Sequence, residues 1–363
     1  MQTGAAIGKG RPSPDHHQHD ERPLSLSAIA IEPEILQNVG ETFDVRPTSD
    51  RLGASRRLPY MKILLIGCGF IGRYFLEEAA RQGHQVSVLD HRRENKAAVD
   101  ARHETILGDI RDRSLIQSLV IEFDCVVNLA GILGTSETVD DPVPSIETNL
   151  LGAVNVFDGL RRPSAHTGRR PRCVQISVGN HFMNNTYAVT KSSAERFAMM
   201  YNKEHGTEIA VVRALNAYGP HQKHAPVRKV IPNFIIAALK NRPIPVFGSG
   251  DQVMDMIYVE DVARILLKAA TAPSVAINSV IEAGTGRRTT VNDIASIILR
   301  LTGSTAGVEH LPMRPGELPD SEVLARTDSI KKLGIQVESL TRLEDGLART
   351  IPWYKANYPW MEC

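Results

Sequence analysis

Residues 62–72 read KILLIGCGFIG, and this stretch decides the fold. The short run KILLI, rich in isoleucine and leucine, is typical of a buried strand. It leads without a gap into the pattern G-x-G-x-x-G at 67–72. The residues that follow, FIGRYFLEEAARQG (70–83), have apolar positions at helical spacing and end in a glycine suited to a C-cap. The segment therefore predicts a strand, a tight glycine turn and a helix in immediate succession.

Further apolar runs alternate with helical segments up to residue 220. They read HQVSVLD, ETILGD, DCVVNLAG, RCVQIS and EIAVVRALN. Strands covered by helices on both faces are apolar throughout, as these runs are. This order predicts an α/β fold of the Rossmann type, with a doubly wound parallel sheet. We expect residues 61–220 to form a dinucleotide-binding domain and residues 221–363 to form a smaller, mixed α/β substrate-binding lobe.

Composition places the chain among ordinary globular proteins. Of its 363 residues 42% are hydrophobic, which is enough for a sizeable core, and the formal net charge is +1. This balance gives no electrostatic reason to expect nucleic acid or an acidic membrane surface as a partner. No apolar run reaches the roughly 18 residues of a membrane-spanning helix. The four cysteines stand singly, which fits a reducing cytoplasm and excludes a C-x-x-C metal or redox site.

The first 60 residues differ from the rest of the chain. They include GKGRPSPDHHQHDERP and lack strong periodicity, so we expect a disordered N-terminal extension. His16, His17 and His19 within it are more simply explained by a polar tail than by a metal site. We therefore expect no bound metal.

The glycine motif predicts a dinucleotide site because its context is complete. Its glycines permit a tight turn and a close approach of the backbone to a pyrophosphate, whose charge the N-terminus of the next helix stabilises. The alternative is a glycine turn that packing alone requires. The candidate cofactor-binding positions are Gly67, Gly69, Phe70, Ile71 and Gly72.

Asp90 supports the dinucleotide interpretation. It ends the second apolar run, about 20 residues beyond the motif, where a carboxylate accepts hydrogen bonds from the adenosine ribose. An acid there repels a 2′-phosphate, which favours NAD over NADP. Arg92 and Arg93 follow closely and weaken that preference.

A second motif joins Tyr187 and Lys191 as Y-x-x-x-K, within the helical stretch NTYAVTKSSAERFAMMYNKEHG. Spacing of four places both side chains on one face of a helix. The ammonium of Lys191 favours the phenolate and so lowers the pKa of Tyr187 towards neutrality. Such a tyrosine takes a proton from a sugar hydroxyl while a hydride moves to a nicotinamide. The spacing alone is common, but its place after the fifth strand of a G-x-G-x-x-G fold makes it informative.

From Met61 to its C-terminus the chain resembles the extended short-chain dehydrogenase/reductase family. That family includes UDP-glucose 4-epimerase and the nucleotide-sugar 4,6-dehydratases. The similar segments occur in the family's order and are specific for the family rather than for one substrate. They are GCGFIG, LGDIRD, NLAG, ETNLLGAVNV, YAVTKSSAE, RALNAYGPHQ, SGDQVMDMIYVEDVA and MRPGELPDSEVLARTDSIKKLGI.

The resemblance implies roles for further residues. Around NAD they are Asp109 and Ile110 at the adenine, Leu129, Ala130 and Gly131 after the fourth strand, and Asn149 near the nicotinamide. On the substrate side they are Asn216 and Arg314 at the diphosphate, Glu317 at the nucleotide ribose, and Lys229 and Val230 beside them. The resemblance also implies a homodimer, formed through the helix that carries Tyr187 and its neighbour.

The chain departs from the family after its fifth strand, where it reads QISVGNHFMNNTYAVTK. Family members place a catalytic Ser or Thr there, and Ser177 matches the serine before it, which leaves Val178 at the catalytic position. Ser177 or Asn180 is the candidate substitute. The acid pair of the dehydratases is replaced by Gly179 and Asn180. Elimination of water needs a general acid and base there, so a standard 4,6-dehydratase is disfavoured.

A second departure is Met254, which stands where the family usually carries an arginine that holds the diphosphate. The cluster GPHQKHAPVRK (219–229) either supplies compensating cations or is a solvated loop. The candidate cations are His221, Lys223, His224, Arg228 and Lys229.

Three functions fit these features. The intact Tyr–Lys pair without the acid pair favours an NAD-dependent epimerase that acts at C4 of a UDP- or TDP-linked sugar through a transient 4-keto intermediate. A dehydratase, decarboxylase or ketoreductase of the same family is the first alternative. An NAD-binding sensor or scaffold that has lost catalysis is the second.

Overall fold

The computed structural model describes residues 60–92, 103–164, 166–272 and 279–357. All of them belong to one compact unit, Arg57–Cys363. The extension predicted at 1–60, with its histidine cluster, lies outside the described residues apart from Tyr60. Within these ranges, no helix is both long and apolar enough to cross a membrane.

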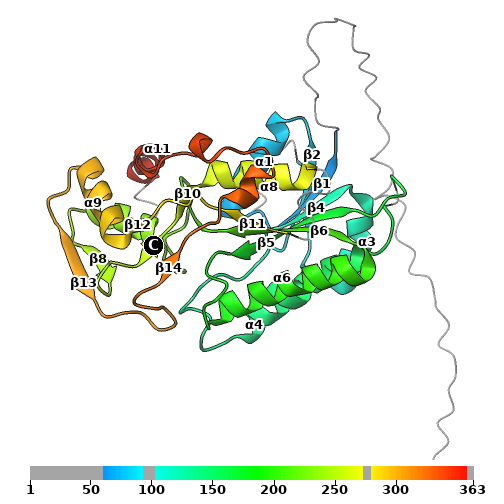
Figure 1. Ribbon diagram of the computed structural model, residues 1–363, viewed down its shortest axis with the longest axis horizontal. Coiled ribbons are helices and arrows are strands. Elements are labelled where there is room, and N and C mark those ends of the chain that lie inside the picture. Colours follow the sequence, from blue (N-terminus) through cyan, green and yellow to red (C-terminus); the bar gives the residue numbers. More distant parts are fainter. Residues whose placement is uncertain (1–59, 93–102, 165, 273–278, 358–363) are drawn as a thin grey trace, which may run out of the picture. The chain divides into compact units, whose positions relative to one another are not determined.

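A seven-stranded parallel sheet confirms the predicted fold class (Figure 1). Its strand order is β11-β6-β5-β4-β1-β2-β3. Within the sheet, the chain runs from β1 outward to β3 and then continues with β4 on the other side of β1. Doubly wound sheets bind ligands at such a reversal, outside the carboxyl ends of the strands. The strands are β1 (Lys62–Ile66), β2 (Gln85–Asp90), β3 (Thr105–Leu107), β4 (Cys125–Asn128), β5 (Arg172–Val178), β6 (Glu208–Ala214) and β11 (Val280–Ala283).

Helices cover both faces of this sheet (Figure 1). One face carries α1 (Phe70–Arg81) and α8 (Val259–Thr271), and the other carries α3 (Arg113–Leu119), α5 (Gly152–Gly159) and α6 (Thr186–His205). Shorter helical segments are η3 (Val120–Glu122), α4 (Val143–Ser145), the π-helical η4 (Ile146–Leu151), α10 (Asp328–Lys331) and η6 (Val337–Ser339).

Alternate residues of each central strand serve the two cores. In β1, Ile63 and Leu65 pack with α1 and α8, whereas Leu64 and Ile66 pack on the opposite side. All four side chains are at most 2% exposed. Burial on both faces is the reason why the run is apolar throughout rather than alternating.

A third hydrophobic cluster lies mostly beyond residue 220 and includes Tyr218, Phe234, Ile294 and Tyr354. Its main helices are α7 (Val230–Leu239), α9 (Val291–Thr302) and α11 (Leu343–Asn357). The short strands of this part are β7 (Asn216–Tyr218), β8 (Ile244–Phe247), β9 (Val253–Met254), β10 (Met256–Tyr258), β12 (Thr289–Thr290), β13 (Val308–Leu311) and β14 (Glu322–Val323). Although α8 and β11 also follow residue 220, they return to the large sheet. The division into two domains at that residue stays a prediction.

One buried carboxylate joins the loops of this part. Asp255 has no exposed surface, and its oxygens accept hydrogen bonds from the backbone N–H and hydroxyl of Thr285 and from the backbone N–H groups of Gly286 and Ala325, at 2.6–3.1 Å. Four donors offset the cost of burying this side chain. Asp255 therefore fixes the loops after β11 and β14 beside β7.

Candidate functional site

The glycine loop after β1 has the geometry that its motif predicts. Gly67 has φ +87°, and a Cβ there would lie 2.9 Å from the backbone of Ala130. A Cβ on Gly72 would lie 2.9 Å from the carbonyl oxygen of Gly67. No side chain caps α1 at Gly69, so the first N–H groups of the helix remain available to an anion. The loop thus forms a backbone cradle that fits a pyrophosphate.

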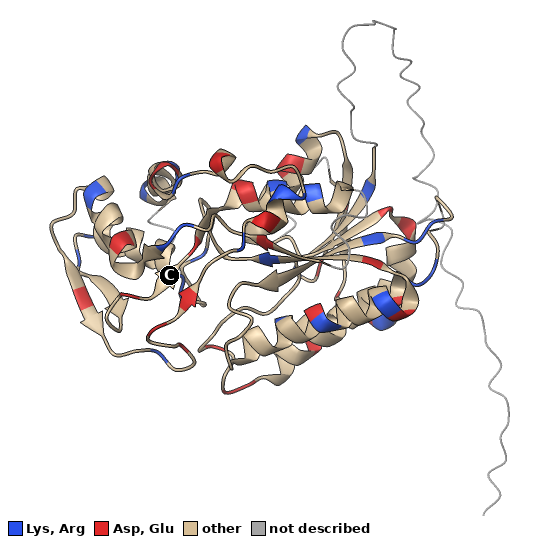
Figure 2. Ribbon diagram, in the orientation of Figure 1, with Lys and Arg blue, Asp and Glu red and all other residues tan. Residues whose placement is uncertain are grey.

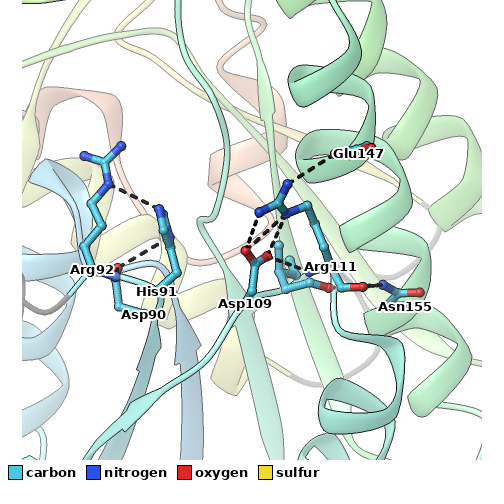
Figure 3. A network of polar contacts seen from close by, with 8 residues as sticks. Asp90, His91, Arg92, Asp109, Arg111, Glu147 and Asn155 are labelled. Carbon is cyan, nitrogen blue, oxygen red and sulfur yellow. Dashed lines mark hydrogen bonds and ion pairs between the residues drawn. The ribbon is translucent and has the colours of Figure 1, made fainter.

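Asp90 is tied to this loop. Its Oδ2 accepts a hydrogen bond from the backbone N–H of Cys68 at 2.8 Å, and its Oδ1 accepts one from the N–H of Arg92 at 2.9 Å. The side chain is 5% exposed. Nδ1 of His91 lies 3.8 Å from Oδ1 of Asp90, and Figure 3 shows Arg92 next to His91. The acid expected at the ribose is therefore oriented by the glycine loop itself.

Asp109 lies at the neighbouring strand end and is held by Arg111 (Figure 3). The guanidinium donates to both of its oxygens at 2.8–3.1 Å and reaches Glu147 of η4 at 3.2 Å. The hydrogen bonds from Arg111 lower the pKa of Asp109 below its usual range. Ile110 is buried, and its carbonyl accepts from Asn155 at 3.1 Å. Contacts to η4 and α5 thus position the segment expected at the adenine.

Lys191 and Asn149 meet the segment after β4. Lys191 is 2% exposed and its Nζ donates to the carbonyl of Ala130 at 2.9 Å. A Cβ on Gly131 would lie 2.7 Å from that Nζ and 2.9 Å from Oδ1 of Asn149. Leu129, just before, donates its N–H to Ile66 at 2.9 Å and so continues the pairing of β4 with β1. The absence of a Cβ at Gly131 leaves room for the ends of the Lys191 and Asn149 side chains.

Asn149 is held on both sides of its amide. Its Oδ1 accepts from the N–H of Ile132 at 2.8 Å, and its Nδ2 donates to the carbonyl of Ile132 at 3.0 Å and to the hydroxyl of Thr190 at 3.1 Å. The side chain is 1% exposed. Asn149 therefore joins η4, α6 and the loop after β4 next to Lys191.

Tyr187 lies in the first turn of α6 and is half-buried. Burial raises the pKa of its phenol above the usual value and lowers the pKa of the Lys191 ammonium to about 8. The sequence led us to expect that Lys191 lowers the pKa of Tyr187. In the protein by itself desolvation outweighs that effect, because burial disfavours the charged form of both groups.

The end of β5 does not bring a hydroxyl to Tyr187. Ser177 donates to Oε2 of Glu195 at 3.0 Å, two turns further along α6. Glu195 also pairs with Arg213 at 2.6 Å. Val178 pairs with Ala214, which packs on the α1 and α8 side, so alternation turns the valine side chain away from α6. Asn180 donates to the Sδ of Met183 at 3.3 Å.

Some of the residues expected at the substrate interact with one another. Arg314 pairs with Glu317 and lies 5.2 Å from the centre of the Phe247 ring. Lys229 stands at the N-cap position of α7, which begins with Val230. Burial lowers the pKa of Lys229, while Glu137 and Glu317 act in the opposite sense. Lys229, Arg314 and Glu317 therefore form one electrostatic cluster.

Asn216 and His221 have partners away from this cluster. Asn216 is held by the carbonyl of Asp255, which accepts from its N–H and its Nδ2, each at 3.2 Å. His221 stacks on Trp353 with ring centroids 4.7 Å apart, and burial lowers its pKa. Of the candidate cations, Lys229 is the one that interacts with Arg314.

Sequence reasoning missed the loop after β4. Glu137 accepts the N–H of Arg228 at 3.1 Å, and Ser136 donates to the carbonyl of Pro315 at 2.9 Å. This loop thus contacts both substrate-side segments. The only sequence signal was its position at the carboxyl end of a central strand. Among the described residues, no group of three His, Cys, Asp or Glu side chains could hold a metal.

The parallel sheet, the glycine cradle with Asp90, and the Tyr187–Lys191 pair define a dinucleotide-dependent enzyme of the Rossmann type. Residues 63–284, more than half of the chain, match the NAD dependent epimerase/dehydratase family, and the chain belongs to that family. NAD is accordingly its cofactor.

Similar proteins have different reactions. The UDP-N-acetyl-alpha-D-glucosaminuronate decarboxylase of Bacillus cytotoxicus is 28% identical, over 80% of this chain and 96% of the relative. The dTDP-glucose 4,6-dehydratase of Mycobacterium tuberculosis is 27% identical, over 83% and 95%. The crystal structure of UDP-glucose 4-epimerase with UDP-glucose from Thermotoga maritima has a TM-score of 0.74 and 25% identity, covering 82% of this chain and 100% of that one. The family therefore defines a class of nucleotide-sugar enzymes and leaves the reaction open.

Proposed function

We propose that this chain is an NAD-dependent epimerase that inverts C4 of a UDP- or TDP-linked sugar through a transient 4-keto intermediate. The observation that carries the proposal is the Tyr187–Lys191 pair, held beside Ala130 and Gly131 at the reversal point of the sheet. The absence of an acid pair at 179–180 in the sequence disfavours dehydration.

Tyr187 and Lys191 have separate roles in the proposed reaction. Tyr187 takes the proton of the C4 hydroxyl and later returns it, and Lys191 stabilises the phenolate while this happens. Bound NAD would supply reversible hydride transfer with C4, and Gly67, Gly72 and Asp90 would hold the dinucleotide.

The substrate side is held by a mixed cluster. Arg314 and Lys229 bind the diphosphate, and the planar fork of the guanidinium suits two phosphate oxygens. Glu317, which pairs with Arg314 in the protein alone, turns to the nucleotide ribose. Asn216 donates its amide to the diphosphate, and Val230 lies beside it at the start of α7.

A second candidate is an NAD-binding sensor or scaffold without catalysis. The observation that favours it is the placement of Ser177 on Glu195 and of Val178 on the far face of the sheet. Neither residue offers a hydroxyl beside Tyr187. The resemblance to the family implies a catalytic Ser or Thr at this position.

One experiment separates the candidates. The purified chain is incubated with NAD and with UDP-glucose, UDP-N-acetylglucosamine and TDP-glucose, and the products are identified by proton NMR. Inversion at C4 supports the epimerase. A stable keto sugar or net NADH indicates a dehydratase, decarboxylase or ketoreductase. Binding of nucleotide sugar without any product at any substrate identifies the sensor or scaffold.

We also propose that the chain works in the cytoplasm as a homodimer. The outer surface of α6 and of η4 exposes large apolar side chains, which suits a contact with a second copy.

A further inference from the structure

Asn185 caps the helix that carries Tyr187. Its backbone is extended, with φ −126° and ψ 160°, and its Oδ1 accepts the N–H of Ala188 at 3.0 Å. Because that N–H needs an acceptor, the amide cannot rotate to exchange its oxygen and nitrogen. The capping bond therefore fixes the direction of the Nδ2 group as well.

That Nδ2 group is buried and has no hydrogen-bond partner among the described residues. The Asn185 side chain is only 5% exposed. A buried donor without a partner costs free energy, and native proteins keep few of them. A serine would cap the helix equally well without this cost. The asparagine therefore retains a donor for which none of the described residues is an acceptor.

The position of Asn185 indicates what the donor meets. It precedes Tyr187 by two residues. Its Cβ lies 3.7 Å from the point that a Cβ on Gly316 would occupy, and Thr135 Cγ2 lies 3.4 Å from the same point. Gly316 stands between Arg314 and Glu317. Asn185 therefore lies against the 314–317 loop, at the start of the helical turn that carries Tyr187.

This is the region in which the chain lacks a hydroxyl from β5, since Ser177 bonds to Glu195 and Val178 faces the other way. We propose that Nδ2 of Asn185 donates a hydrogen bond to an oxygen on the sugar ring of the nucleotide-linked substrate. This inference rests on the proposed function, because it assumes that a sugar lies between Tyr187 and the 314–317 loop.

The chemistry of an amide limits what Asn185 can do. A side-chain amide does not give up a proton near neutral pH, so it orients and polarises the oxygen without acting as an acid or base. Tyr187 remains the group that carries the proton. A fixed neutral donor aimed at an oxygen that gains negative charge lowers the barrier, so its loss should affect kcat as well as binding.

The test uses substitutions that keep the cap. Asn185→Ser and Asn185→Asp both preserve an oxygen for the N–H of Ala188 and remove the donor. We measure NAD affinity, melting temperature, kcat and KM, and the ratio of the Kd values of UDP and UDP-glucose. Thr290→Ser, a substitution of the same kind at the cap of α9, is the matched control.

We expect both Asn185 variants to keep their melting temperature and NAD affinity. The ratio of the Kd of UDP to the Kd of UDP-glucose should fall about tenfold, as the loss of one hydrogen bond predicts. The value of kcat/KM should fall at least as much. Asn185→Asp should be the weaker enzyme, because its carboxylate repels the diphosphate. If Asn185→Ser fails to fold, Asn185→Asp, which keeps the size of the side chain, carries the test.

The outcomes separate this inference from the proposed function. A wild type that binds UDP-glucose more tightly than UDP but never inverts C4 overturns the epimerase, and the Kd ratio still tests Asn185. An unchanged ratio and unchanged kinetics in Asn185→Ser overturn the role of Asn185 while leaving the epimerase intact. A parallel loss of melting temperature, NAD affinity and activity assigns Asn185 to structure alone and also overturns the inference. A wild type with no preference for any sugar-linked nucleotide overturns both.

Discussion

Tyr187 is the residue at which the proposed chemistry is tested most directly. Tyr187→Phe removes the hydroxyl that carries the proton but keeps the ring that packs in the first turn of α6. We expect turnover to fall by about 10²–10⁴-fold, the usual contribution of a general acid or base. NAD affinity, measured by calorimetry, should be unchanged.

Tyr201→Phe is the matched control for that substitution, because Tyr201 lies on the same helix and its hydroxyl bonds to Asp158 at 2.8 Å, away from the site. It should keep the activity of the wild type. Near-full turnover in Tyr187→Phe would remove the phenol from the mechanism.

The burial of His84 predicts how the stability of the folded chain depends on pH. Neither ring nitrogen has a partner among the described residues, the side chain is 5% exposed, and burial lowers its pKa from the usual 6.5. The unfolded chain therefore binds a proton as the pH falls through 6.5, before the folded chain does. The contribution of neutral His84 to the free energy of unfolding is therefore complete above pH 6.5 and is lost progressively as the pH falls below it.

His84→Leu should flatten this dependence. Urea unfolding at a series of pH values between 7.5 and 5 provides the comparison, with His91→Gln, an exposed histidine, as the control. An equally steep loss of stability in wild type and His84→Leu would show that other groups cause it.

At the scale of single elements, the glycine loop and α1 depend on one close contact. A Cβ on Gly72 would meet the backbone oxygen of Gly67 at 2.9 Å, a separation that real Cβ atoms essentially never show. Gly72→Ala should shift the loop and weaken NAD binding by about tenfold or more, even though alanine favours the helix by up to about 1 kcal/mol. Fluorescence titration with NADH measures this.

Glu77→Ala, on the exposed side of the same helix, is its control and should bind the dinucleotide normally. Normal affinity in Gly72→Ala would contradict the assigned position of the cofactor.

Local sequence predicted the elements whose causes are local. The run KILLI and the glycine pattern specify a strand and a turn within eleven residues, and both are present. The contacts of Asp255 with Thr285 and Ala325, or of Glu137 with Arg228, join residues far apart in the chain. No periodicity encodes such pairs, because they exist only after the elements have packed. The pKa of Tyr187 was misjudged for the same reason, since its burial depends on the whole fold.

At the scale of the whole molecule, Figure 2 shows acidic and basic residues interspersed along the described ribbon. The distinctive surface is apolar instead. Ile146, Leu151, Val189, Phe197 and Met200 are 38–52% exposed on η4 and α6. Several large apolar side chains exposed on two neighbouring elements suit an interface and support the proposed homodimer.

The two faces of α6 make this proposal separable from catalysis. Lys191 contacts Ala130 beneath the helix, whereas Val189 and Phe197 are exposed on its outer side. The double variant Val189→Glu, Phe197→Glu should therefore be monomeric in sedimentation at micromolar concentration, because two buried carboxylates would oppose the contact, while it still binds NAD. Leu107→Glu, an exposed apolar position on β3, should leave the dimer intact. A wild type that sediments as a monomer would refute the dimer and leave the catalytic proposal untouched, since the residues assigned to the cofactor and substrate all come from one chain.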